Sequence, residues 1–188
     1  PVGWKVNDVQ VVSDNANDIL RAIDYAFSKS DVVLTTGGLG PTKDDITKSV
    51  LCQYFGGELK EDAATLENVK EVVRKRGFKI NELTASQAIV PSSCRVIQNL
   101  VGTAPLMWFE KEGKVLISMP GVPFETRQMF RDAVLPQLLE KFHSNITIEH
   151  RTLLVINYTE SALATKIAAR DDALPPHLHL AHQPKPGL

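Results

Sequence analysis

The residues with the clearest chemistry stand together in residues 31–47. This segment begins with a short apolar run, which predicts a buried strand. A glycine-rich loop follows, and then the start of an amphipathic helix. Glycine lacks a Cβ, so its backbone can adopt positive φ and approach a ligand closely. Backbone N–H groups at a helix start favour an anion, and threonine hydroxyls add donors. The predicted phosphate-binding residues are Thr36, Gly37, Gly38, Gly40, Thr42 and Thr47.

Two aspartates in the same stretch, Asp44 and Asp45, decide what kind of phosphate site this is. Carboxylates repel phosphate unless a cation lies between them, and Mg²⁺ commonly joins one or two carboxylates to substrate phosphates. We therefore predict a metal-assisted phosphate or pyrophosphate site. The alternative is that either aspartate is only the N-cap of the following helix, because Asp is a preferred cap residue.

Further candidates stand at other turns, namely Asp14, Asn99, Gly121 and Glu125. Asn99 and Gly121 are predicted substrate- or phosphate-binding residues, because a polar turn at a strand end, such as the one with Asn99, can contact an adenine or ribose. Ligands of open α/β sheets bind at the carboxyl ends of the strands, where Asp14 is expected. The turn containing Gly121 repeats the order of strand, glycine and helix. Each position also has an ordinary explanation: Asp14 and Asn99 suit turns, and Glu125 suits the positive end of a helix.

The periodicity of apolar residues predicts the elements that position these groups. Helices and strands alternate, which predicts a three-layer α/β fold with a mainly parallel sheet and an antiparallel hairpin. Trp108 and Phe109 fall on opposite faces of that hairpin, so one of them is expected near the surface. The predicted strands are 5–12, 32–34, 95–97, 106–110 and 114–119, and the predicted helices are 15–27, 45–55, 62–75, 83–88 and 123–142.

Length and composition limit the class of protein. The chain has 188 residues, 43% apolar and 23% charged, which is ordinary for one globular domain plus a small one. A net charge of −1 gives no basic surface for nucleic acid. There is no apolar run long enough to span a membrane and no signal peptide. We expect a cytoplasmic protein in which Cys52 and Cys94 are reduced thiols, Cys52 on a buried helix face.

The character of the sequence changes near residue 146, which predicts domains at 1–145 and 146–188. The second range should hold a strand over 147–155, a helix over 159–170 and an exposed strand over 177–182. These elements are too few to enclose a core, so we interpret them as the start of a small α+β domain. The histidines of 177–182 are expected to face solvent rather than bind zinc, because no Cys or further ligand accompanies them.

The loop Thr36-Gly37-Gly38-Leu39-Gly40-Pro41-Thr42, followed by Asp44-Asp45-x-Thr47, resembles the signature of the molybdopterin-binding-domain superfamily. It is most similar to the CinA (competence/damage-inducible) family. The segments Pro120-Gly121-Val122-Pro123-x-Glu125 and Val12-x-Asp14-Asn15 carry the same resemblance. One departure is that the family's opening strand, with its Gly-Asp-Glu segment, has no counterpart here. The chain is therefore predicted to begin after that element.

This resemblance implies a metal-dependent pyrophosphatase that splits ADP-ribose into AMP and ribose 5-phosphate. Asp45 and Asp14 would be catalytic, and Asp45, Asp44 and Glu125 would hold a divalent metal such as Mg²⁺, with K⁺ as an additional ion. The alternatives are a protein that binds or adenylylates molybdopterin, and a non-catalytic nucleotide- or pterin-binding module. The expected partner is a nucleotide or pterin, in a homo-oligomer that contacts neither nucleic acid nor membrane.

Overall fold

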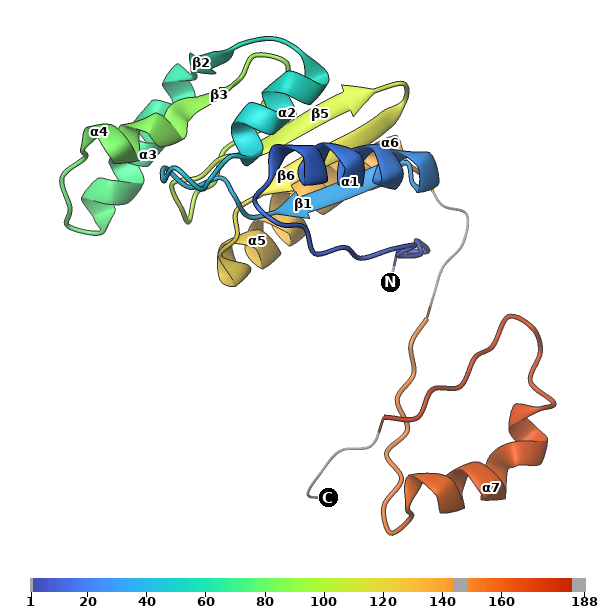
Figure 1. Cartoon of the computed structure of the whole chain (residues 1–188). Coiled ribbons are helices and arrows are strands. Elements are labelled where there is room, and N and C mark those ends of the chain that lie inside the picture. Colours follow the sequence, from blue (N-terminus) through green and yellow to red (C-terminus); the bar gives the residue numbers. More distant parts are fainter. Residues whose placement is uncertain (1, 144–148, 184–188) are drawn as a thin grey trace. The chain divides into compact units, whose positions relative to one another are not determined.

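The computed structural model of the chain describes residues 2–143 and 149–183, which belong to two separate units. The first unit is built around one sheet (Figure 1). Strand β1 pairs in parallel with β6, and β6–β5 and β5–β4 are antiparallel. The sheet is therefore mixed, and its order is β1 (Val32–Thr36), β6 (Lys114–Met119), β5 (Leu106–Lys111) and β4 (Arg95–Ile97).

Helices cover both faces of this sheet, and a hydrophobic cluster lies on each side. Helices α1 (Ala16–Lys29) and α2 (Thr47–Phe55) supply one side, where Ile23 and Leu51 pack against Phe109 and Leu116. The other side is covered by α5 (Pro123–Met129), η2 (Phe130–Val134) and α6 (Leu135–Lys141). The predicted three-layer α/β fold is confirmed. The sheet is not mainly parallel among the described residues, however, because the β5–β6 hairpin and the pairing of β4 with β5 make two of its three pairings antiparallel.

The hairpin of β5 and β6 is confirmed, but the expected exposure of one of its aromatic residues is wrong. Glu112 and Gly113 form the turn, both with positive φ, as two-residue hairpins prefer. Trp108 and Phe109 do point to opposite faces, yet they are only 3% and 1% exposed. The reason is that helices bury both faces of the sheet, so neither side of β5 meets solvent.

The strand predicted over 5–12 is wrong. These residues form no ladder, and Val6, Val9 and Val11 are exposed. β-branched residues favour a strand only where a partner strand can pair with it, and among the described residues no strand pairs with the free edge of β1. The next prediction is confirmed: α1 starts after Asn15, whose side chain accepts hydrogen bonds from the N–H groups of Asn17 and Asp18.

The long helix predicted over 123–142 is divided by the π-helical segment η2. Pro136 follows in the first turn of α6, where its missing N–H is tolerated. The π-segment changes the phase of the helix after residue 130. Met129, Val134 and Leu138 are buried, whereas Phe124 and Leu139 are exposed.

Residues 59–91 form a lobe beside the sheet (Figure 1). Its helices α3 (Ala63–Lys75), α4 (Glu82–Ala85) and η1 (Ser86–Ala88) agree with the predictions. A short antiparallel ladder between β2 (Leu59–Glu61) and β3 (Ile89–Pro91) was not predicted. Both cysteines are free thiols, and Cys52 is buried on α2 as expected.

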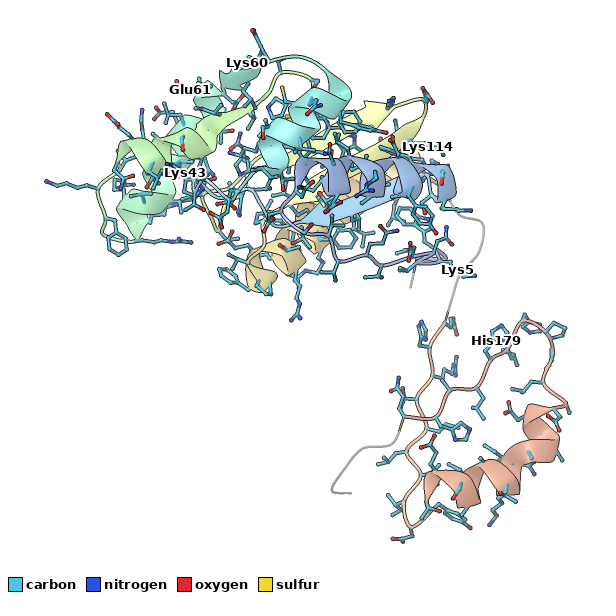
Figure 2. All side chains as sticks on the ribbon, in the orientation of Figure 1. Lys5, Lys43, Lys60, Glu61, Lys114 and His179 are labelled. Carbon is cyan, nitrogen blue, oxygen red and sulfur yellow. The ribbon has the colours of Figure 1, made fainter. Side chains whose placement is uncertain are left out.

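The second unit contains α7 (Glu160–Asp171), capped by Thr159, which confirms the predicted helix. Residues 149–155 and 177–182 form no strand, so the strands expected there are wrong within the described range. Neither segment pairs with a strand among the described residues, and Figure 2 shows the side chains of this unit spread around its helix. His177 and His179 are exposed. In both described ranges, no helix is long and apolar enough to cross a membrane.

Candidate functional site

Two turns meet where the parallel strands β1 and β6 end. The N–H of Gly37 donates to the carbonyl of Met119 at 3.1 Å, and the hydroxyl of Thr36 donates to the carbonyl of Pro120 at 2.7 Å. A Cβ on Gly121 would lie 3.3 Å from the Cα of Gly37. The glycine loop and the Pro120–Gly121 turn therefore form one continuous surface at this edge of the sheet.

The conformation of the glycine loop depends on Gly37 and Gly38, whose φ angles are 99° and 64°. Residues other than glycine adopt such angles at a cost in free energy. The N–H of Thr47 donates to the carbonyl of Gly38 at 3.2 Å, and a Cβ on Gly38 would collide with the Thr47 hydroxyl. Leu39 is buried in the core, so the loop is fixed to the sheet. A Cβ on Gly37 would meet nothing within 4 Å, so a ligand can approach the backbone there.

Asp44 and Asp45 converge on one hydroxyl group. The Thr42 Oγ1 atom lies 2.6 Å from both Asp44 Oδ1 and Asp45 Oδ2, although a hydroxyl has one hydrogen to donate. Two carboxylates this close repel each other, and a cation between them would relieve the repulsion. Helix α2 begins after Ile46 without a side-chain cap, so the alternative in which an aspartate only caps α2 does not apply.

Hydrogen bonds favour the ionised form of Asp45. Burial works to raise the pKa of Asp45, but hydrogen bonds from the hydroxyl and N–H of Thr42 and from the backbone of Gly40 outweigh it. The positive charge of Lys48 acts in the same direction, and the resulting pKa lies below its ordinary value. An ionised carboxylate is the form that binds a hard cation.

Lys48 is a residue of this site that the sequence interpretation missed. Its Nζ donates to the backbone carbonyl of Gln87 at 2.8 Å, which ties α2 to the lobe of residues 59–91. Burial lowers the pKa of Lys48 to about 8, although the nearby charges of Asp45 and Cys94 work against the shift. The spacing of three residues from Asp45 along a helix start is the signal that could have identified it.

Lys48 is expected to make the stability of the protein rise with pH. An unfolded lysine holds its proton until about pH 10.5, whereas Lys48 in the folded chain releases it near pH 8. The unfolded state therefore binds more protons between these values, so the free energy of unfolding rises there, by about 1 kcal/mol between pH 8 and pH 9. Urea unfolding of the native chain and of Lys48→Met at both pH values measures this gain.

The comparison with Lys48→Met removes an opposite effect from Cys94, because burial raises the pKa of that thiol to about 11. Folding then opposes loss of the thiol proton, which lowers stability between about pH 9 and pH 11 in both proteins. Equal pH dependence in the native chain and in Lys48→Met would contradict a buried lysine that titrates early.

The other acidic candidates, Asp14 and Glu125, form no metal-binding group with the aspartate pair among the described residues. Asp14 is exposed in the turn before α1. Asn99 and Glu125 contact each other, at 2.9 Å between Nδ2 and Oε2. Within residues 2–143 and 149–183, no three His, Cys, Asp or Glu side chains are grouped closely enough to hold a metal ion by themselves. The aspartate pair therefore fits a metal that also uses ligand phosphates and water, which is the usual arrangement for Mg²⁺.

Residues 1–140 match the model of a family described as a probable molybdopterin binding domain. A solved structure described as CinA with unknown function, from Thermoplasma acidophilum, superposes with a TM-score of 0.61. It is 35% identical in sequence, over 74% of this chain and 78% of that one. The chain belongs to the CinA family. The resemblance carried by the glycine loop and the Pro120–Gly121 turn is thereby confirmed.

Two CinA-like proteins, from Flavobacterium psychrophilum and Cytophaga hutchinsonii, are each 42% identical to this chain. Each similarity covers 99% of this chain but only 44% of the relative. The chain thus spans less than half the length of these CinA-like relatives.

Proposed function

We propose that this CinA-family chain carries the site of a metal-dependent pyrophosphatase that acts on a nucleotide such as ADP-ribose. The observation that supports it is the juxtaposition of an open glycine backbone with the carboxylates of Asp44 and Asp45. Both stand at the carboxyl edge of the sheet, where α/β folds bind ligands. A backbone that phosphate oxygens can approach and carboxylates that can hold Mg²⁺ are together suited to phosphate chemistry.

The glycine loop would bind the pyrophosphate, and its threonines would hold the surrounding groups in place. Gly37, whose Cβ position is open, would let phosphate oxygens approach the backbone. Gly38 and Gly40 give room to the Thr47 hydroxyl and the Asp45 carboxylate, which a Cβ at those positions would strike. The Thr36 hydroxyl already donates to Pro120, so its part is to hold the Pro120–Gly121 turn beside the loop. Thr47, next to Gly38, would orient the loop and one carboxylate.

Asp45 and Asp44 would hold the divalent cation together with phosphate oxygens and water. Asp14, in the turn before α1, is not grouped with them and would act as a separate catalytic carboxylate. When bound, such an ion neutralises phosphate charge and lowers the pKa of an attacking water. Thr42 keeps the two carboxylates together through its hydroxyl. The cation's demand for ionised ligands agrees with the lowered pKa of Asp45.

A second candidate function is the binding or adenylylation of molybdopterin. The family model that matches residues 1–140 is described as a probable molybdopterin binding domain, and the same loop and aspartates would serve. A third is a binding module without turnover. The three differ in what becomes of the ligand, so one set of measurements separates them.

The test is release of AMP from ADP-ribose by this chain, with Mg²⁺, with Mg²⁺ and K⁺, and with chelator. A second protein, in which the opening strand of a CinA relative precedes Pro1, is measured in parallel. Metal-dependent AMP release supports the pyrophosphatase. No release from either protein, together with binding of molybdopterin, would overturn it in favour of the pterin function. Binding of ADP-ribose without turnover in both would favour the binding module.

A further inference from the structure

Glu125 carries a buried carboxylate whose two oxygens each lie near a side chain of the protein, Asn99 or Arg76. It is 6% exposed and stands in the first turn of α5. Its Oε2 accepts a hydrogen bond from Asn99 Nδ2 at 2.9 Å. Its Oε1 lies 3.9 Å from Nη2 of Arg76, at the end of α3. A buried carboxylate needs such partners, because an unpaired charge in the interior is costly.

The side-chain amide of Asn99 is hydrogen-bonded to neighbouring groups of the protein. Asn99 is 0% exposed. Besides Glu125, its Nδ2 donates to the carbonyl of Ala104 at 3.0 Å, and its Oδ1 accepts from the N–H of Val101 at 3.1 Å. An amide NH₂ has two hydrogens, and both are engaged here. Asn99 therefore has no donor left for an adenine or ribose, and its contacts fold residues 99–104 into a fixed loop.

The 99–104 loop is wrapped around the Glu125 carboxylate. A Cβ on Gly102 would collide with that carboxylate and would lie 2.6 Å from Asn99 Nδ2. On the outer side, Arg76 Nη2 donates to the carbonyl of Val101 at 2.7 Å. The carboxylate thus lies between the loop and α5, with Arg76 bridging both. Four residues before it stands Gly121, whose turn contacts Gly37 of the glycine loop.

We propose that Glu125 is a positioning residue rather than a ligand of the metal: through Asn99 it holds the 99–104 loop against the start of α5, and so keeps the Pro120–Gly121 turn in place beside the glycine loop. The assignment of a ligand to the glycine loop rests on the proposed function, but the contacts of the carboxylate do not. Both Glu125 oxygens face protein donors, whereas the carboxylates of Asp44 and Asp45 share a single hydroxyl.

Exchanging the two polar groups tests this inference. Asn99→Asp places a carboxylate against Glu125 and removes the donor to Ala104, so the 99–104 loop should lose protection from hydrogen exchange. Affinity for Mg²⁺-ADP-ribose should fall roughly tenfold. Glu125→Gln keeps an acceptor for Asn99 and should change both quantities less than Asn99→Asp does. The double variant Asn99→Asp/Glu125→Gln restores a donor–acceptor pair and should recover part of the loss.

Mg²⁺ titration distinguishes positioning from metal binding. If Glu125 positions the loop, the Mg²⁺ concentration at half-maximal ADP-ribose binding is unchanged in Glu125→Gln. A tenfold or greater rise in that concentration, or a double variant no better than Asn99→Asp, would overturn the proposal. If neither the native chain nor any variant binds ADP-ribose, the proposed function fails. Hydrogen exchange of the amides in the 99–104 loop then still tests the role of Glu125.

Glu110→Gln serves as the matched control. Glu110 also pairs with a cation, Lys141 at 2.8 Å, but it lies in β5. Its side chain accepts hydrogen bonds from Trp108 and Lys141, which belong to neither the 99–104 loop nor α5. Its replacement should leave exchange of that loop and the Mg²⁺ requirement as in the native chain.

Discussion

Replacing Asp45 with asparagine is expected to abolish metal-dependent hydrolysis, with a loss of at least about 100-fold in kcat/KM. The change removes one negative charge from the pair that converges on Thr42 and keeps the side-chain volume. The amide oxygen can still accept from the Thr42 N–H, which Asp45 does at 3.1 Å. The fold should therefore persist, and circular dichroism with an AMP-release assay measures both parts of the prediction.

Asp132→Asn is the control for this substitution. Asp132 is an exposed carboxylate in η2 that pairs with Arg131, and its loss should leave turnover unchanged. Turnover retained in Asp45→Asn at native levels would remove Asp45 from the mechanism. Equal losses in both variants would indicate a general effect of charge rather than a metal site.

Replacing Gly38 with valine is expected to weaken nucleotide binding by at least about tenfold, which corresponds to a loss of about 1.4 kcal/mol in binding free energy. Two effects add. The φ of 64° is unfavourable for a β-branched residue, and the new Cβ would collide with the Thr47 hydroxyl that lies against the loop. The loop must then move away from α2, which changes the surface offered to a phosphate. Calorimetric titration with ADP-ribose measures the loss.

Gly77→Val separates these two effects. Gly77 has a φ of 76°, and a Cβ there would meet nothing within 4 Å. This variant carries the backbone cost of positive φ without the collision, so it should lower stability slightly and leave nucleotide binding unchanged. Nucleotide affinity that is undiminished in Gly38→Val would argue against the glycine loop as the phosphate site.

The parts of the fold that depend on local sequence could be predicted. Helices α1, α3 and α7 follow their apolar periodicity and their capping residues Asn15, Asp62 and Thr159. The turn of the β5–β6 hairpin follows from a glycine that tolerates positive φ. The glycine loop could be recognised because its residues are contiguous, so one short segment carries both the conformation and the acidic pair.

Features that depend on distant partners could not be predicted. Residues 5–12 have the composition of a strand but pair with nothing in the described structure. Trp108 and Phe109 are both buried because helices from before and after β5 in the sequence cover its two faces. The contact of Asn99 with Glu125 joins residues 26 positions apart, and no local pattern indicates that their side chains use each other's hydrogen-bonding groups.

The chain has two tryptophans, and both belong to one side of the sheet. Trp108 lies in the cluster under α5 and α6, and Trp4 packs against the same cluster, with its ring 6.5 Å from that of Phe142. Intrinsic tryptophan fluorescence therefore reports on that layer alone. A thermal melt followed at this emission will record the first unit only, and loosening of α7 will pass without a signal. Optical assays of the second unit need a chromophore introduced there.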